Sequence, residues 1–180
     1  MKNVYYHGSR DANLKVLVTE KSKDGYVYLT PDYNTAVMYG ASSLRFWAWD
    51  TTNRLIIREI GPNMLEKLYK GVPCYVYSTT DIGEFEDSNN NGRPGVKAKH
   101  DVKLKKAEYI EDSYEKIMEL YRDGKIIIWF WEKYSTEEKK EIKYIMQKKY
   151  KPSVMKHEKE FFPEEYKKLV KICPYLKLKD

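Results

Sequence analysis

The sequence predicts an α+β domain that carries a helical extension. Short runs of alternating aromatic and aliphatic residues recur up to about residue 131, and glycine, proline or polar residues bound them. Helical patterns lie between these runs and dominate the chain after residue 131. For a chain of 180 residues we therefore expect one domain at 1–131, with a helical extension at 132–180 packed on it.

The expected strands are short and apolar. Residues 26–29, with the sequence YVYL, alternate in type and follow a turn at Gly25. Residues 125–131, with the sequence KIIIWFW, are expected to be a buried strand or a packing face. The other expected strands are residues 4–6, 14–19, 54–60, 74–78, 97–104 and 108–110.

The first expected helix covers residues 30–39. Thr30 can cap it, and Pro31 suits the first helical position. Asp32 complements the positive end of the helix dipole, and Gly40 is expected to end the helix.

Later helices are expected at 62–69, 112–124, 135–150 and 163–173. Tyr114, Ile117 and Tyr121 repeat at helical spacing in the second of these. Ser135 and Glu138 form a capping box at the start of the third. The extension is thus expected to consist of two helices.

The positive charge of the chain is moderate and unevenly placed. The sequence contains 33 Lys+Arg and 27 Asp+Glu, a net charge of +6, and residues 101–180 contribute 20 basic and 16 acidic side chains. Lysines and glutamates mix there, as they do on solvated helix faces. The best basic patch, residues 139–151, is read as a helix exterior, so a nucleic-acid partner is allowed but not required.

Several classes of protein are excluded by composition. The longest apolar run, residues 126–131, is far shorter than the ~20 residues of a membrane span, and the N-terminus has no signal-peptide core. Two cysteines exclude a disulfide framework and a cysteine-based zinc site, and a reducing cytoplasm is expected. The loop that begins D-x-N-x-N at Asp87 has Ala98 where a calcium loop needs glutamate, so no metal is expected.

Residues that could bind a ligand or take part in catalysis cluster in the first forty positions. His7-Gly8-Ser9 follows a strand, Tyr28 lies on the next clear strand, and Tyr39 lies one helix later. A glycine after a strand-end histidine lets the backbone approach a flat ligand, and the histidine can hold a ribose hydroxyl. Two tyrosines can enclose a planar ring. These parts suit a nicotinamide riboside.

The segments 6–9 and 25–30, with the helix that contains Ala36 and Tyr39, resemble the NAD-binding half of the ADP-ribosyltransferase superfamily. The closer resemblance is to the diphtheria-toxin and poly(ADP-ribose) polymerase branch, which has a His-Tyr-Glu triad. RNA 2′-phosphotransferases and several families of bacterial and phage proteins share this scaffold. The resemblance covers roughly residues 4–40 and implies two small, mainly antiparallel sheets around a cleft, with helices outside.

The resemblance also implies roles for individual residues. His7 would hold the adenosine-side ribose hydroxyl, and Gly8 would bond the nicotinamide amide through its backbone. Tyr28 and Tyr39 would stack on the nicotinamide ring.

The helix departs from the family pattern at one position. The family usually offers a serine hydroxyl to the amide oxygen where this chain has Ala36, with Thr35 beside it. Ser9, which completes the strand-end motif, and Thr35 are included among the expected NAD-binding residues.

The third triad member has several candidates. The family's glutamate bonds the ribose 2′-hydroxyl and stabilises the oxocarbenium-like transition state as nicotinamide leaves. In the register of related families His100 replaces this glutamate, and we place it first. Glu84 or Glu86 comes next and Glu108 last.

The function expected from the resemblance is binding of NAD as a substrate and transfer of ADP-ribose to a macromolecule, either protein or nucleic acid, or hydrolysis of NAD. The runner-up is removal of a 2′-phosphate from RNA, which needs arginines that converge on phosphates. A third possibility is an inactive nucleotide-binding or interaction module. The arginines available for the removal of a 2′-phosphate are Arg10, Arg45, Arg54, Arg58 and Arg93.

Overall fold

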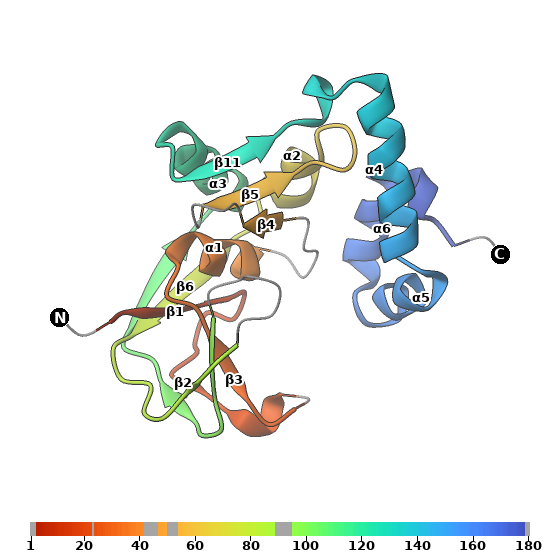
Figure 1. Cartoon of the computed structure of the whole chain (residues 1–180). Helices are drawn as coiled ribbons and strands as arrows, with labels where there is room; N and C mark the ends of the chain where they lie inside the picture. The colour runs from red at the N-terminus through yellow and green to blue at the C-terminus, as the bar shows by residue number, and fades with distance from the viewer. Residues whose placement is uncertain (1–2, 23, 42–46, 50–53, 89–94, 179–180) are drawn as a thin grey trace.

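The computed structural model describes residues 3–22, 24–41, 47–49, 54–88 and 95–178, and only the backbone of residues 47–49. Helices and strands occur together, so the expected α+β class is confirmed (Figure 1). The strands of the described part form several small sheets instead of one continuous sheet. As a result, strands that belong to different sheets, such as those that contain His7 and Tyr28, are neighbours.

The first sheet contains the strand that ends in His7-Gly8-Ser9. Its order is β1 (Tyr5–Ser9), β6 (Cys74–Thr79) and β10 (Lys106–Ile110), and all its pairs are antiparallel. The register sets His7 opposite Tyr77 and Gly8 opposite Val76.

The second sheet contains Tyr28. Its order is β3 (Val27–Leu29), β8 (Val96–Ala98) and β7 (Glu86–Asp87), again antiparallel. One face of this sheet is apolar. Together with β2 (Val16–Leu17) and β9 (Val102–Lys103) it encloses a small core that includes Tyr5 of β1, Val27, Leu29, Val96 and Ala98.

A single bridge joins these two sheets. The Tyr6 amide donates to the Thr30 carbonyl at 2.8 Å, and the Thr30 amide donates to the Tyr6 carbonyl at 2.9 Å. Regular pairing between β1 and β3 does not extend beyond this isolated bridge. We call the place where the strands diverge, next to His7, Gly8 and Tyr28, the splay point.

The third sheet lies on the other side of the main core. It contains β4 (Trp47–Trp49), β5 (Leu55–Arg58) and β11 (Ile126–Trp129), with β5 in the centre and β11 parallel to it. The helices α2 (Met64–Tyr69) and α3 (Ser113–Arg122) pack beside this sheet.

Helix α1 (Tyr33–Ala41) packs against β1 and β6. The Asp32 side chain caps it by accepting a hydrogen bond from the Thr35 amide at 2.6 Å. The expectation that Thr30 caps this helix is therefore wrong, because the helix begins only at Tyr33. The Thr30 hydroxyl instead accepts a hydrogen bond from the Asp32 amide at 3.1 Å, in the turn before the helix. The helix also continues past Gly40 to Ala41, because Gly40 is buried between Ser9 and Cys74.

The chain after residue 131 forms three helices, not the expected two. They are α4 (Thr136–Lys149), α5 (Pro152–Phe161) and α6 (Pro163–Ile172). The expected break at Pro152 starts α5, because proline suits the first turn of a helix. The capping box of Ser135 and Glu138 is confirmed. Short 3-10 turns occur at Thr19–Lys21, Trp131–Lys133 and Pro174–Leu176.

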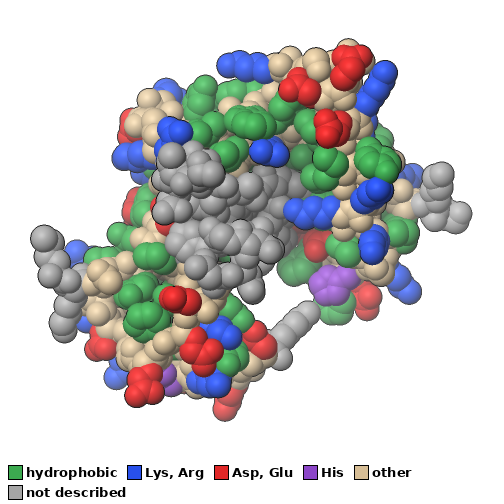
Figure 2. All heavy atoms as spheres, in the orientation of Figure 1, with side chains coloured by type: hydrophobic (Ala, Val, Ile, Leu, Met, Phe, Trp, Pro, Cys, Tyr) green, Lys and Arg blue, Asp and Glu red, His purple; other side chains and the backbone are tan. Residues whose placement is uncertain are grey.

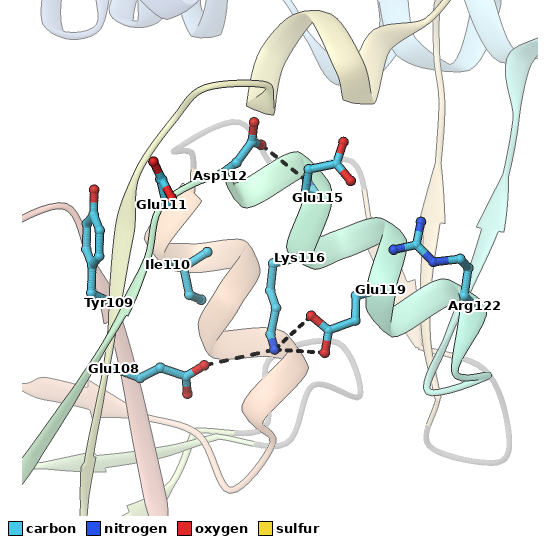
Figure 3. A pocket seen from close by; sticks show the side chains of 9 residues that line it. All are labelled: Glu108, Tyr109, Ile110, Glu111, Asp112, Glu115, Lys116, Glu119 and Arg122. Atoms are coloured by element: carbon cyan, nitrogen blue, oxygen red, sulfur yellow. Dashed lines mark hydrogen bonds and ion pairs between the residues drawn. The ribbon is translucent and has the colours of Figure 1, made fainter.

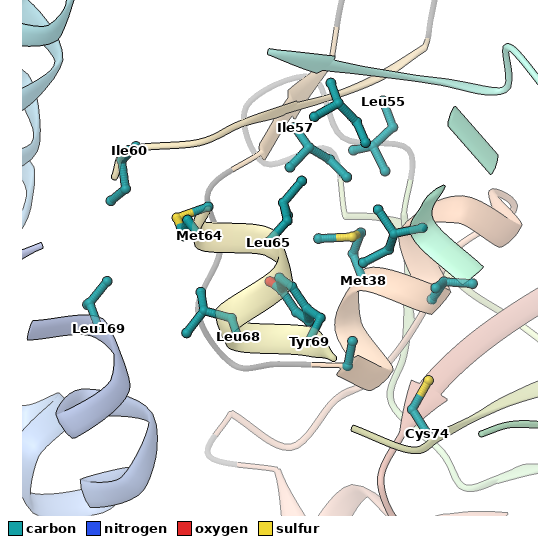
Figure 4. Packing of buried hydrophobic residues seen from close by; sticks show 14 of the residues in the cluster. Met38, Leu55, Ile57, Ile60, Met64, Leu65, Leu68, Tyr69, Cys74 and Leu169 are labelled. Carbon is teal, nitrogen blue, oxygen red and sulfur yellow. The ribbon is translucent and has the colours of Figure 1, made fainter. Parts of the chain in front are cut away.

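The C-terminal helices contribute to the main hydrophobic core. Leu169 of α6 is buried in the same cluster as Met64 of α2 and Ile57 of β5 (Figure 4). Met155 of α5 belongs to this cluster as well. The Tyr175 hydroxyl donates to the Ile60 carbonyl at 2.6 Å. The region 132–180 thus shares its core with the rest of the chain.

Two expected strands differ in extent from the prediction. Residues 97–104 form β8 and β9 with a turn between them, in which His100 lies. Residues 14–19 shorten to β2, followed by a 3-10 turn. No helix in the described part of the chain is long and apolar enough to cross a bilayer.

Candidate functional site

His7 lies at the splay point with a fixed orientation. Its Nδ1 is 3.0 Å from the Tyr28 carbonyl oxygen. Because a carbonyl only accepts, Nδ1 carries the proton, and in the neutral ring Nε2 is an acceptor. Burial lowers the pKa of His7, which favours that neutral form. The imidazole thus offers an acceptor suited to a hydroxyl group.

The contact between His7 and Tyr28 has a simple structural origin. In an antiparallel ladder the backbone groups of alternate residues point to the same side. The bridge through Tyr6 and Thr30 therefore directs the backbone groups of Gly8 and Tyr28 toward each other's strand. The strands have diverged at that point, so the Tyr28 carbonyl does not pair with the backbone of β1. It accepts a hydrogen bond from the His7 side chain instead.

Gly8 is required by packing on one side and presents its backbone on the other. A Cβ at this position would lie 1.8 Å from the Ala36 carbonyl oxygen and 2.5 Å from the Gly40 amide nitrogen, both in α1. Its pairing with Val76 is of the non-hydrogen-bonded kind, because Tyr6, two residues earlier, bonds away from β6. The N–H and C=O of Gly8 therefore face the splay point, as a donor and acceptor pair.

Tyr28 presents an exposed ring on the polar face of the second sheet. Its neighbours Val27 and Leu29 are buried, whereas Tyr28 is 42% exposed. Its hydroxyl donates to Asp24, and this hydrogen bond raises the pKa of Tyr28 to about 12. The ring is thus held at its tip as a neutral phenol.

Helix α1 brings the second tyrosine to the end of β1. A Cβ added at Gly40 would lie 3.2 Å from the Ser9 amide nitrogen, so this part of α1 lies close to Ser9. Tyr39, next to Gly40, is 36% exposed. Thr35 and Ala36 are buried at 1% and 0% exposure. Both therefore lie inside the protein in this conformation, and the expected Thr35 contact with a ligand would require α1 to move.

Ser9 is tied to the following turn. Its hydroxyl accepts a hydrogen bond from the Asp11 amide at 3.1 Å. The structure therefore brings together the strand end 7–9, the strand of Tyr28 and the end of α1 that bears Tyr39.

Glu86 is the third-position candidate that shares a face with Tyr28. Lys97 of β8 pairs with Tyr28 on one side and with Glu86 on the other, so the three side chains form one row. Two strand spacings separate Tyr28 from Glu86, about 10 Å. The Glu86 carboxylate forms ion pairs with Lys97 at 3.3 Å and Lys99 at 3.6 Å, and the hydrogen bond from Lys97 lowers its pKa.

Glu84 is exposed on the bend before β7. The adjacent ring of Phe85 packs on Tyr5, with 5.8 Å between the ring centroids. Tyr5 and His7 alternate with Tyr6 and therefore share one face of β1. The segment that contains Glu84 and Glu86 thus approaches the face of β1 to which His7 belongs.

The other two candidates have different surroundings. His100 Nε2 is 2.8 Å from the Ile82 carbonyl, and its ring lies against Gly83, so it fastens the β6–β7 connection. Glu108 aligns with Val76 and Gly8 across the first sheet and accepts from the Tyr33 hydroxyl of α1 at 2.8 Å. It therefore lies on the α1 side of that sheet, opposite the face that bears His7.

Two of the candidate arginines have structural partners. The Arg10 guanidinium donates to Glu165 of α6 at 2.7 Å and to the Ala41 carbonyl at 2.8 Å. Arg58 lies over the Trp129 ring, 4.2 Å from its centre. Arg45 and Arg93 lie outside the described residues.

A separate open groove of ≈ 420 Å³ lies between β10 and α3 (Figure 3). Carboxylates dominate its lining, and its Lys116 is paired with Glu108 and Glu119. Such a surface repels the phosphates of a nucleotide. No group of metal-ligating side chains occurs among the residues that the structure describes.

Sequence reasoning missed Asp24, Lys97 and Lys99 around Tyr28. Asp24 could have been found, because a polar residue four positions before Tyr28 across the Gly25 turn can return to the tyrosine tip. The lysines carry no such signal, because their position depends on the pairing of β8 with β3.

No protein-family model, curated protein or solved structure matches this chain. The functional interpretation therefore rests on the geometry of the splay point and on the residues around it.

Proposed function

We propose that this chain binds NAD at the splay point and is an ADP-ribosyltransferase-like protein, which transfers ADP-ribose to a macromolecular target or hydrolyses NAD. The observation that supports this most is the contact between His7 and the Tyr28 carbonyl. It holds an acceptor nitrogen, the backbone pair of Gly8 and an exposed tyrosine ring at one place. A ribose hydroxyl, a carboxamide and a planar ring are the complementary groups.

In this proposal the chain's groups divide the work by chemistry. His7 Nε2 accepts a hydrogen bond from a ribose hydroxyl, and the N–H and C=O of Gly8 form hydrogen bonds with the carboxamide of nicotinamide. Tyr28 stacks on the nicotinamide ring, and Tyr39 covers it from the helix side. Cleavage of the glycosidic bond forms positive charge at the ribose, which a nearby carboxylate stabilises. Glu86 takes this role, because it shares a face with Tyr28.

A binding module without turnover is the second candidate. It is favoured by the pairing of Glu86 with two lysines, Lys97 and Lys99. Ammonium groups at this distance oppose the attraction of the carboxylate for a developing cation. The RNA 2′-phosphotransferase alternative is less well supported, because the Arg10 guanidinium is already paired with Glu165 and Arg58 lies over the Trp129 ring.

The test compares two substitutions of His7 that distinguish the contributions of its two ring nitrogens. In His7→Asn the side-chain amide can still donate to the Tyr28 carbonyl, but the Nε2 acceptor is removed. In His7→Gln the side chain reaches the Nε2 position but loses the bond to Tyr28. His157→Gln, far along the chain on α5, serves as the control. Binding is measured by thermal shift with millimolar NAD and turnover by release of nicotinamide.

We expect His7→Asn to retain the wild-type melting temperature without ligand and to bind NAD roughly tenfold more weakly. The control should match the wild type. A wild-type protein that neither binds NAD nor nicotinamide at millimolar concentration contradicts the proposal. Binding without nicotinamide release, unchanged by Glu86→Gln, identifies the binding module instead.

A further inference from the structure

A second surface, on the C-terminal helices, is rich in lysine. The segment 142–156 contains five lysines and no aspartate or glutamate. It covers the second half of α4 and the start of α5. We call it the basic segment. Figure 2 shows several Lys and Arg side chains along these helices, and acidic side chains are also present near the start of α4.

Helix α4 lies on the protein as an exposed ridge. It is described throughout, and none of its residues is fully buried. Its apolar side chains Ile142 and Met146, with Tyr150 at its end, pack against the main core. The outward face therefore consists of polar groups, with Tyr144 and Ile145 as its exposed apolar side chains, at 58% and 46% exposure.

Tyr144 and Lys148 form one unit on this face. The Lys148 ammonium lies 4.2 Å from the centre of the Tyr144 ring, one helical turn away. Lys143 and Lys151 are exposed on either side of them in the sequence. An aromatic ring set among ammonium groups that have no carboxylate in the same segment is complementary to a phosphate backbone with unstacked bases.

We propose that the basic segment binds single-stranded nucleic acid. Lys143, Lys148 and Lys151 contact phosphates, and Tyr144 stacks on a base. A lipid surface is a poorer fit, because an interfacial helix needs a free apolar face and that of α4 is packed on the core. The inference goes beyond the proposed function and does not depend on it, because the basic segment shares no residue with the splay point.

The test measures the fluorescence anisotropy of a labelled single-stranded DNA 20-mer in 50 to 200 mM salt. The variant Lys143→Gln/Lys148→Gln/Lys151→Gln is compared with a control of equal charge change, Lys103→Gln/Lys105→Gln/Lys106→Gln. These control lysines are exposed in β9, in β10 and in the connection between them. Loss of three phosphate contacts lowers the slope of log K against log salt by about 2. We therefore expect at least a tenfold loss of affinity at 50 mM salt for the first variant and less than threefold for the control.

A separate variant, Tyr144→Ala, tests the aromatic contact. We expect about a tenfold loss of affinity for the oligonucleotide with an unchanged salt slope, because stacking involves no ion release. Three results overturn the proposal: no binding by the wild type at 50 mM salt, equal losses in both triple variants, or tighter binding to poly-glutamate or to phosphatidylserine vesicles than to the oligonucleotide. Circular dichroism of each variant verifies that the helices remain.

Discussion

At the scale of single residues, Gly8 has two independent reasons to be glycine. Its backbone faces the splay point, and the space for a side chain is occupied by α1. The resemblance to ADP-ribosyltransferases accounts for the first reason alone. The second is a matter of packing and applies whether or not a nucleotide binds.

The substitution Gly8→Ala separates these reasons. We expect a loss of at least about 2 kcal/mol in the free energy of unfolding without nucleotide, because the new methyl group would meet the backbone of Ala36 and Gly40. Urea denaturation measures this. The neighbouring change Ser9→Ala, which removes one exposed hydrogen bond, should cost about 1 kcal/mol or less. Equal effects of the two changes would show that the contact between β1 and α1 is looser than the distances indicate.

At the scale of secondary-structure elements, one buried carboxylate connects a helix to a strand end. Glu59 is 2% exposed. Its Oε1 accepts from the Leu65 amide in the first turn of α2, and its Oε2 accepts from the Trp131 amide after β11, both at 2.9 Å. Asn63 occupies the N-cap position of α2, but its side chain makes no capping hydrogen bond. Glu59 therefore does the work of a cap from outside the helix.

Removal of this carboxylate leaves two amides without their acceptor. Glu59→Ala should lower the free energy of unfolding by about 1–3 kcal/mol for each. Glu59→Gln should have an intermediate effect, because its amide oxygen can serve one of them. Chemical denaturation measures both against Glu66→Gln, which removes an exposed ion pair with Lys70 and should change the free energy of unfolding only slightly. A loss no larger than that of the control would contradict the capping role.

The same group predicts a pH dependence. Burial raises the pKa of Glu59 above its ordinary value of 4.5, so the folded protein binds this proton more tightly than the unfolded chain. The corresponding stability is present below pH 4.5 and is lost as the pH rises through the higher pKa of the folded state. The difference in unfolding free energy between wild type and Glu59→Gln should therefore vary with pH across this window and be constant above it.

At the scale of the whole molecule, the C-terminal helices and the sheets share one hydrophobic core. Leu169 and Met155 are 0% and 1% exposed in the main core, and Arg10, directly after the strand-end motif, is paired with Glu165 of α6. The helical region thus supports the strand end at the splay point. Because the core is shared in this way, separation of residues 132–180 from the rest of the chain would expose buried apolar side chains to water.

The substitution Leu169→Ala tests this cooperativity. We expect a loss of about 2–5 kcal/mol, and unfolding in a single transition. All four tryptophans lie within residues 1–131, so their fluorescence reports on the region that does not contain the mutation. The unfolding transition followed by tryptophan fluorescence should shift together with the one followed by circular dichroism. The control Val154→Ala, at an exposed side chain, should leave both transitions nearly unchanged. A shift of the circular dichroism transition alone would indicate a separate domain.

The sequence by itself determined the α+β class, the capping box at Ser135, the end of α4 before Pro152 and the start of α6 at Pro163, because these depend on local spacing and on backbone chemistry within a few residues. It also singled out His7, Gly8, Tyr28 and Tyr39 by their order along the chain. Only the tertiary structure decided that His7 bonds the Tyr28 carbonyl, that Lys97 lies between Tyr28 and Glu86, and that Thr35 is buried. The physical reason is strand register. Residues about 70 positions apart become neighbours through hydrogen bonds between β3 and β8, and no local pattern specifies which residues those bonds align.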